Sequence, residues 1–293
     1  MTGGRATETT SHATATIAVV SGDPTTTWSF EPGILIAIAC YVGIYVWRYR
    51  HARRESRGRG VGPQHLVFFG VAILALLAGL ITPLAALGEE RLFSMHMFQH
   101  VLLADIAPLF LLLSLSRVMM RPATRRLVAI ERKLGRLAHP ATFFVAWLAL
   151  IYVWHYPPLY EAAIENDVVH ALEHAVFFAA GLLFWWPLIQ PVPMRHRLTG
   201  LQPFAYLALG KVLLGLFGVY LTWTDHVLYP YYETVPRTWG LSPIADQNVG
   251  GAIMMAEQSI VLACAFVVLF ARMLTQSEQE QERRERLEEL RAT

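Results

Sequence analysis

Two pairs of histidines with the same spacing stand at the start of two long apolar segments. His96 and His100 lie in "SMHMFQHVLLADIAP", and His170 and His174 lie in "HALEH". On an α-helix, side chains four residues apart share a face, so each pair presents two imidazoles in one direction. Neutral imidazole is the commonest metal ligand in proteins. The two pairs therefore predict one metal site between two helices, and the spacing leaves copper, zinc and a haem iron open as its occupant.

Further polar or sulfur-bearing side chains are expected at the same level of the apolar segments. His155 and His226 each close such a segment, and for these two a contact with water or lipid headgroups is the alternative interpretation. Thioethers beside imidazoles favour copper, especially Cu(I). The side chains expected as additional ligands or as partners of the ligands are Met97, Glu173, Asp246, Gln247, Met254, His155 and His226.

Three charged residues lie deep inside apolar segments. Asp105, Lys211 and Glu257 all fall near the middle of their segments at a rise of about 1.5 Å per residue. Isolated charges are costly at that depth, so we expect the lysine to pair with the carboxylates. The cluster predicts a structural ion pair or, alternatively, a path for protons or ions.

The apolar residues indicate a membrane protein. Hydrophobic residues make up 55% of the 293 and charged residues only 16%, whereas a soluble domain usually carries about 25% charge. A helix needs about 20 apolar residues to cross a bilayer. Seven blocks are candidate spans: roughly 30–49, 65–87, 94–116, 141–156, 168–190, 203–224 and 248–272.

The basic residues predict how the chain is oriented. The segments 48–64, 117–139, 191–202 and the C-terminal tail contain 20 of the 24 Lys and Arg residues. Positive loops stay in the cytoplasm, so the N-terminus is expected outside and the C-terminus inside. The spacing of Leu127, Ile130 and Leu134 among the arginines predicts an amphipathic interfacial helix in 117–139. These basic loops would face anionic lipid, and we expect no nucleic acid partner.

The chain is expected to form a single domain with two tails. Residues 1–29 are rich in Thr, Ser and Ala and predict a disordered outer tail, residues 30–275 the seven-helix transmembrane domain, and residues 276–293 a charged cytoplasmic helical tail. Cys40 and Cys264 both lie in spans without a CxxC pattern, so neither a disulfide framework nor a thiolate site is predicted.

Three segments carry a resemblance to a known family. "MHMFQHVLLADIAPLFLLL", "HALEHAVFFAAGLLFWWPLI" and "ADQNVGGAIMM" resemble the signature segments of the CtaG family of cytochrome c oxidase assembly factors, seven-helix proteins of the bacterial plasma membrane linked to maturation of caa-type oxidases. The resemblance spans roughly residues 65–272. The family's histidines carry over onto His96, His100, His170 and His174, and its Asp-Gln pair onto Asp246 and Gln247. Asp105 and Glu257 depart from the pattern and make the middle of the bundle more charged.

The resemblance implies a non-enzymatic assembly factor that handles copper for a cytochrome c oxidase subunit, with a copper chaperone as a further partner. Two other classes of function remain open. One is a bis-histidine haem protein that moves electrons in the membrane. The other is a proton- or ion-coupled transporter that uses Asp105, Lys211 and Glu257, although the sequence has no inverted repeat of the kind that many transporters show.

The charge asymmetry generates a prediction about topology. Reporter fusions at residues 125 and 285 should both show cytoplasmic activity, because residue 125 lies in the basic segment 117–139 and residue 285 in the C-terminal tail, which also contains basic residues. A fusion at residue 240, in a segment with few basic residues, is the matched control and should report the outer side. A periplasmic or extracellular signal at residue 125 or 285 would contradict the orientation.

Overall fold

The computed structural model describes residues 23–292, and this part of the chain is helical without strands. Six helices are long and apolar enough to cross a membrane, or seven if the bent pair Arg117–Ala138 and Pro140–Trp154, which turns by 73°, counts as one span. The all-helical, membrane-spanning class expected from the sequence is confirmed, whereas the orientation stays a prediction. The predicted tail of residues 1–29 lies mostly outside the described residues.

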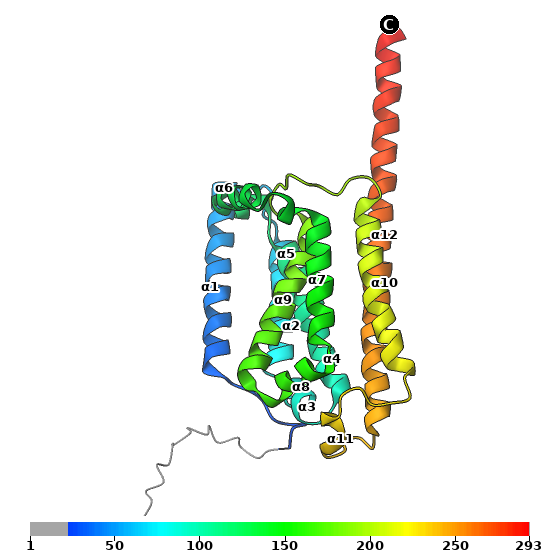
Figure 1. The fold of residues 1–293 in the computed structure, drawn as a ribbon. Helices are drawn as coiled ribbons and strands as arrows, with labels where there is room; N and C mark the ends of the chain where they lie inside the picture. Colours follow the sequence, from blue (N-terminus) through cyan, green and yellow to red (C-terminus); the bar gives the residue numbers. More distant parts are fainter. Residues whose placement is uncertain (1–22, 293) are drawn as a thin grey trace, which may run out of the picture.

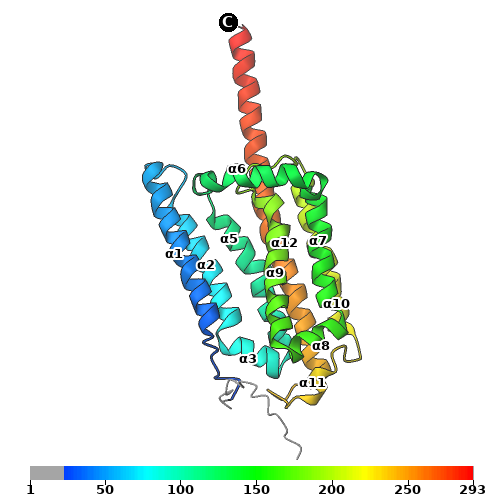
Figure 2. The same cartoon turned by 60° about the vertical axis from the view of Figure 1, so that its left-hand side comes forward.

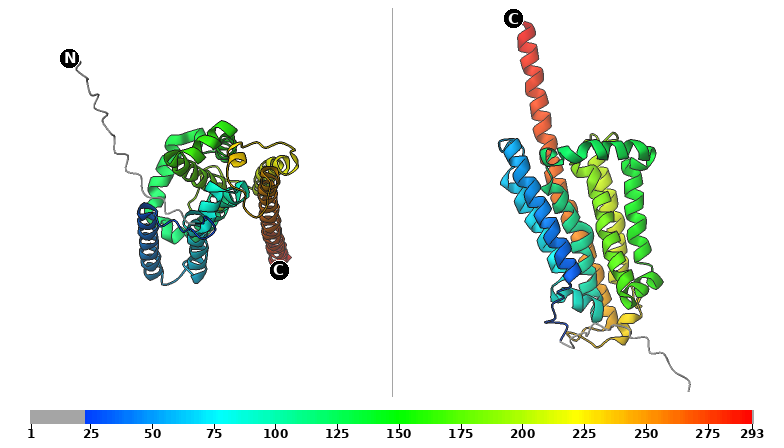
Figure 3. Two further views of the ribbon diagram at one scale, coloured as in Figure 1. Left: turned by 90° about the horizontal axis from the view of Figure 1, so that it is seen from below. Right: turned by 90° about the vertical axis from the view of Figure 1, so that its left-hand side faces the viewer.

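Long helices run side by side through the bundle, with α1 and α12 on opposite sides of it (Figures 1 and 3). The third of them consists of three consecutive segments, α4, η1 and α5. The bounds are α1 (Pro32–Glu55), α2 (Pro63–Leu80), α4 (Phe93–Val101), η1 (Leu102–Ile106), α5 (Ala107–Ser114), α7 (Pro140–Trp154), α9 (Asp167–Ile189), α10 (Gln202–Trp223) and α12 (Pro243–Ala292).

The remaining helices cover the two ends of the bundle. At one end α6 (Arg117–Leu134) and η2 (Gly135–Ala138) lie across the long helices, and α12 projects beyond them (Figure 2). This is the amphipathic helix expected in the basic segment 117–139. The opposite end is formed by α3 (Pro83–Glu90), α8 (Pro157–Glu165) and α11 (Tyr231–Thr234).

Two expected spans have different limits in the structure. The span expected over 65–87 is too long, because α2 ends at Leu80 and α3 begins anew at Pro83. Proline cannot donate the backbone hydrogen bond that would continue α2, and Thr82 caps the new helix by accepting from the Leu84 N–H at 3.3 Å. The fourth span is short: α7 has 15 residues, about 22 Å at 1.5 Å per residue.

A π-helical segment interrupts the third span and carries Asp105. Pro108 has no N–H for the carbonyl of Ala104, and its ring crowds that carbonyl, so the regular α-helix is broken there. Gly181 of α9 lies directly against the Ala104 carbonyl oxygen. The absent side chain at Gly181 thus lets α9 approach the broken segment closely.

The close contact between Gly181 and the Ala104 carbonyl predicts that one added methyl group at Gly181 would be destabilising. Gly181→Ala should lower the thermal stability of the purified protein in detergent, because its Cβ would overlap the Ala104 carbonyl and lie 2.7 Å from Pro108 Cγ. Such overpacking costs about 1–3 kcal/mol or more. The control is Gly215→Ala in α10, where the nearest atom, Gln258 Cβ, is 3.8 Å away. Equal melting temperatures for the two variants would refute the close contact.

Candidate metal centre

The first turn of α4 is capped by a carboxylate from α12. The Phe93 N–H donates to Asp246 Oδ2 at 2.6 Å, and the Ser94 N–H donates to Asp246 Oδ1 at 3.2 Å. These N–H groups have no partner within the helix, and Leu92, which precedes it, has no side chain that can accept from them. A negative charge at a helix N-terminus is also favourable. Asp246 therefore fixes the helix end that carries His96.

Gln247 anchors the long connection before α12. Its Oε1 accepts from the Leu228 N–H at 2.6 Å, and its Nε2 donates to the His226 carbonyl at 3.1 Å. The side chain of His226 is 62% exposed and contacts Asp225, so His226 does not join the other histidines at this end of the bundle. The Asp-Gln pair that carries the family resemblance thus positions a helix and a loop.

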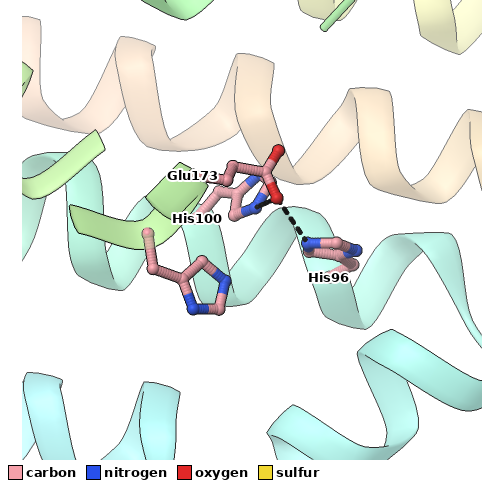
Figure 4. A group of neighbouring side chains, drawn as sticks. His96, His100 and Glu173 are labelled. Carbon is pink, nitrogen blue, oxygen red and sulfur yellow. Dashed lines mark ion pairs between the residues drawn. The ribbon is translucent and has the colours of Figure 1, made fainter. Parts of the chain in front are cut away.

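Three of the four paired histidines meet one carboxylate between α4 and α9. The potential ligand atoms of His96, His100, His174 and Glu173 all lie within 4.8 Å of one another. Figure 4 shows Glu173 of α9 beside the two imidazoles of α4. Its Oε2 is 3.9 Å from His96 Nε2 and 3.7 Å from His100 Nε2. We call these four residues the His–Glu cluster.

The fourth paired histidine and one further histidine flank the His–Glu cluster. The ring centroid of His170 is 4.1 Å from that of His174, and its Nδ1 is 3.6 Å from Glu89 Oε1 in α3. The ring centroid of His155, at the end of α7, is 6.0 Å from that of His100. Five of the six histidines expected at the outer helix ends therefore gather at one place.

The His–Glu cluster and the two histidines that flank it have polar atoms that no described residue satisfies. The buried atoms without a hydrogen-bond partner include both oxygens of Glu173, both ring nitrogens of His100, and Nε2 of His96, His155, His170 and His174. Leaving one buried polar group unpaired costs about 1–3 kcal/mol. Among them, the ligand atoms of the His–Glu cluster lie close enough together to fit one bound metal ion, which would satisfy them jointly.

Two tyrosines contact Nδ1 of His96, and Nε2 is the ring nitrogen that faces the His–Glu cluster. The Tyr232 hydroxyl donates to the Gly88 carbonyl at 2.8 Å and lies 3.0 Å from the Tyr160 hydroxyl, which is 2.9 Å from His96 Nδ1. Each donor is used if Nδ1–H donates to Tyr160, Tyr160 to Tyr232, and Tyr232 to Gly88. Burial raises the pKa of Tyr160 and Tyr232 well above their usual range, so both keep their hydrogens. In this arrangement the lone pair of His96 Nε2 faces the cluster, as a metal ligand requires.

His155 is held in the same tautomer by simpler means. Its Nδ1 lies 2.8 Å from the Ile151 carbonyl, and because a carbonyl only accepts, Nδ1 must carry the hydrogen. Neither Tyr160 nor Tyr232 was predicted from the sequence to belong to the site. The aromatic run "YPYYET" in the segment 225–247 was the only signal for one of them, and no local pattern marks Tyr160.

The three charged residues near the middle of the bundle are in contact, as the cost of isolated charges led us to expect. Lys211 Nζ forms an ion pair with Asp105 and lies 3.6 Å from Glu257 Oε1. The Trp185 indole N–H donates to the second oxygen of Asp105, and the amide of Gln258 contacts Glu257. Lys211 is 1% exposed. The cluster links η1, α9, α10 and α12 at one depth.

A small cavity separates the His–Glu cluster from these charges. Its volume is about 30 Å³, and it lies among α4, η1, α7, α9, α10 and α12. The residues that line it and that bear polar or sulfur atoms are Met97, His100, Asp105, Trp147, His155, Met254, Glu257 and Gln258.

Comparison with known proteins identifies the family. The family model for the cytochrome c oxidase caa3 assembly factor matches residues 43–276, and the chain belongs to this family. An uncharacterized protein of Mycobacterium leprae is 26% identical over 268 residues, and one of Mycobacterium bovis is 27% identical over 264. These matches cover 84% and 83% of this chain but 39% of each relative, so the chain spans well under half of their length. No solved structure matches the chain.

The buried ion pair generates a prediction about stability. Lys211→Met should lower the stability of the bundle by about 3–5 kcal/mol, because it leaves the Asp105 carboxylate without its partner. The measurement is a thermal or denaturant unfolding curve in detergent. Adding Asp105→Asn to Lys211→Met should restore part of the loss, since Asn keeps an acceptor for the Trp185 N–H without the charge. A double variant no more stable than Lys211→Met would contradict the ion-pair explanation.

Proposed function

We propose that this oxidase assembly factor of the bacterial plasma membrane handles copper at the His–Glu cluster. The observation that carries the proposal is the convergence of His96, His100, His174 and Glu173, whose ligand atoms lie within 4.8 Å of one another and lack other partners. Imidazole suits copper and zinc alike. Copper is favoured by the thioethers of Met97 and Met254, which line the adjoining cavity.

The geometry favours a single ion over a haem. A haem iron would need its macrocycle between the imidazoles, but the adjoining cavity has a volume of only about 30 Å³. The ring centroids of His96 and His100 are also only 4.2 Å apart, which suits two ligands of one ion and leaves no space for a porphyrin between them. A strong Soret band from the purified protein would overturn this choice.

The proposed role is the delivery of copper to a cytochrome c oxidase subunit, with an outside copper chaperone as the source, and it requires no catalysis. The His–Glu cluster lies at the end of the bundle that the distribution of basic residues predicts to be on the outer side of the membrane. His170 stands between the cluster and Glu89, with its Nδ1 3.6 Å from Glu89 Oε1. The partly exposed His170 and Glu89 thus provide metal-ligand atoms between the protein surface and the buried His–Glu cluster.

The test is metal retention by a ligand variant. Purified His174→Ala should bind copper about 100-fold or more weakly than the unchanged protein, because losing a ligand should cost more than the 10–100-fold typical of losing an outer partner. In a host that depends on this protein, the same variant should fail to restore the spectrum of the mature oxidase. Copper is measured by mass spectrometry after dialysis against a chelator.

His226→Ala is the matched control, since His226 follows the end of the apolar helix α10 but its side chain is exposed and lies among Tyr220, Thr224 and Asp225. It should retain copper and support maturation as the unchanged protein does. Normal copper retention and normal maturation by His174→Ala would show that the His–Glu cluster is not the functional site.

A further inference from the structure

His100 differs from its neighbours His96 and His155. The Nδ1 atoms of His96 and His155 each have a hydrogen-bond partner, which leaves each of these rings with one unpaired nitrogen. Both nitrogens of His100 are buried without a hydrogen-bond partner. Its Nε2 lies 3.7 Å from Glu173 in the His–Glu cluster, while the ring also lines the cavity toward the middle of the bundle. His100 therefore borders two separate sets of donors.

The second set of donors contains two thioethers. Met97 lies on the same face of α4 as His100, three residues before it, and is fully buried. Gly250 of α12 packs against it, because a Cβ at Gly250 would lie 3.3 Å from Met97 Cγ. Met254 lies one helical turn beyond Gly250 and is 5% exposed. Met97 and Met254 line the same cavity as His100 and His155, whose Nε2 lacks a partner.

We propose that Met97, Met254, His100 and His155 form a second metal site, deeper than the His–Glu cluster, for a soft monovalent ion such as Cu(I). Thioethers prefer Cu(I) and offer little to zinc or to hard cations. The carboxylate of Glu173 belongs to the His–Glu cluster and is not among the residues that line the cavity. The two sites thus differ in chemistry: imidazole and carboxylate above, imidazole and thioether below.

The shared histidine couples the two sites. A neutral imidazole has one N–H and one lone pair, so His100 can be a ligand in only one site at a time. An ion that enters the deeper site takes His100 away from the His–Glu cluster. Passage of Cu(I) between the sites needs no electron, because imidazole binds the same ion. This inference rests on the proposed function in one respect: it takes the ion in both sites to be copper.

Silver(I) binding tests the deeper site separately from the His–Glu cluster. Silver(I) is a soft monovalent ion like Cu(I) and does not change oxidation state during the measurement. Met97→Leu with Met254→Leu should bind one Ag(I) fewer per chain than the unchanged protein and lose the sulfur neighbours of silver in X-ray absorption. Zinc(II) binding by the same variant should be unchanged, since zinc would use the His–Glu cluster. Met-to-Leu exchanges keep the volume and cost little stability.

The matched control is Met95→Leu with Met255→Leu. Met95 and Met255 lie on the same two helices as Met97 and Met254 and close to them in sequence. Neither of them lines the cavity. The control should bind silver and zinc as the unchanged protein does. Silver binding without sulfur neighbours, or equal silver binding by both double variants, would overturn the deeper site. If His174→Ala loses zinc binding but still binds silver, the deeper site is supported. If His174→Ala binds zinc as the unchanged protein does, the result counts against the proposed function alone.

Discussion

The ion pair between Lys211 and Asp105 is the interaction on which the arrangement of the bundle depends. It joins α10 to the π-helical segment that follows α4, and Glu257 extends it to α12. A lone charge in the interior of a membrane protein is costly, so the three groups constrain their helices to meet at one depth. The Trp185 N–H brings α9 to the same point. The helices that carry the histidines and methionines are thereby held in register below the His–Glu cluster.

Two histidines beside the Glu173 carboxylate are oriented by neighbouring groups that are not candidate ligands. Tyr160 and Tyr232 hold His96, the Ile151 carbonyl holds His155, and Asp246 holds the start of α4. These contacts engage the Nδ1 atoms of His96 and His155 and leave their Nε2 atoms unpaired. Folding therefore orders this part of the proposed metal site, so that an ion would not have to supply that ordering.

The sequence predicted those features that depend on periodicity and on the cost of buried charge. The spacing of His96 and His100 placed both rings on one face, and the charge of Lys211 required a carboxylate nearby. The close approach of Gly181 to Ala104 could not be predicted, because it follows from a helix broken by Pro108 and from how α9 packs there. Tyr160 was missed for a similar reason: its hydroxyl meets His96 across 64 residues of sequence, and only tertiary packing brings them together. Glu173 was expected beside the ligands, and its place among the ligand atoms depends on the rotation of α9.

The position of Lys211 also bears on the direction in which a bound cation could travel. The cavity below His100 ends at Asp105 and Glu257, and both of these carboxylates contact the Lys211 ammonium. A cation that reached this level would lose the attraction of carboxylates already engaged and would meet a fixed positive charge in a region where charges interact strongly. A transporter would need the opposite arrangement, with unpaired acceptors continuing toward the end covered by α6. The buried ammonium instead closes the end of the cavity nearest the middle of the bundle, so the proposed sites would exchange an ion only at the end that α3, α8 and α11 cover.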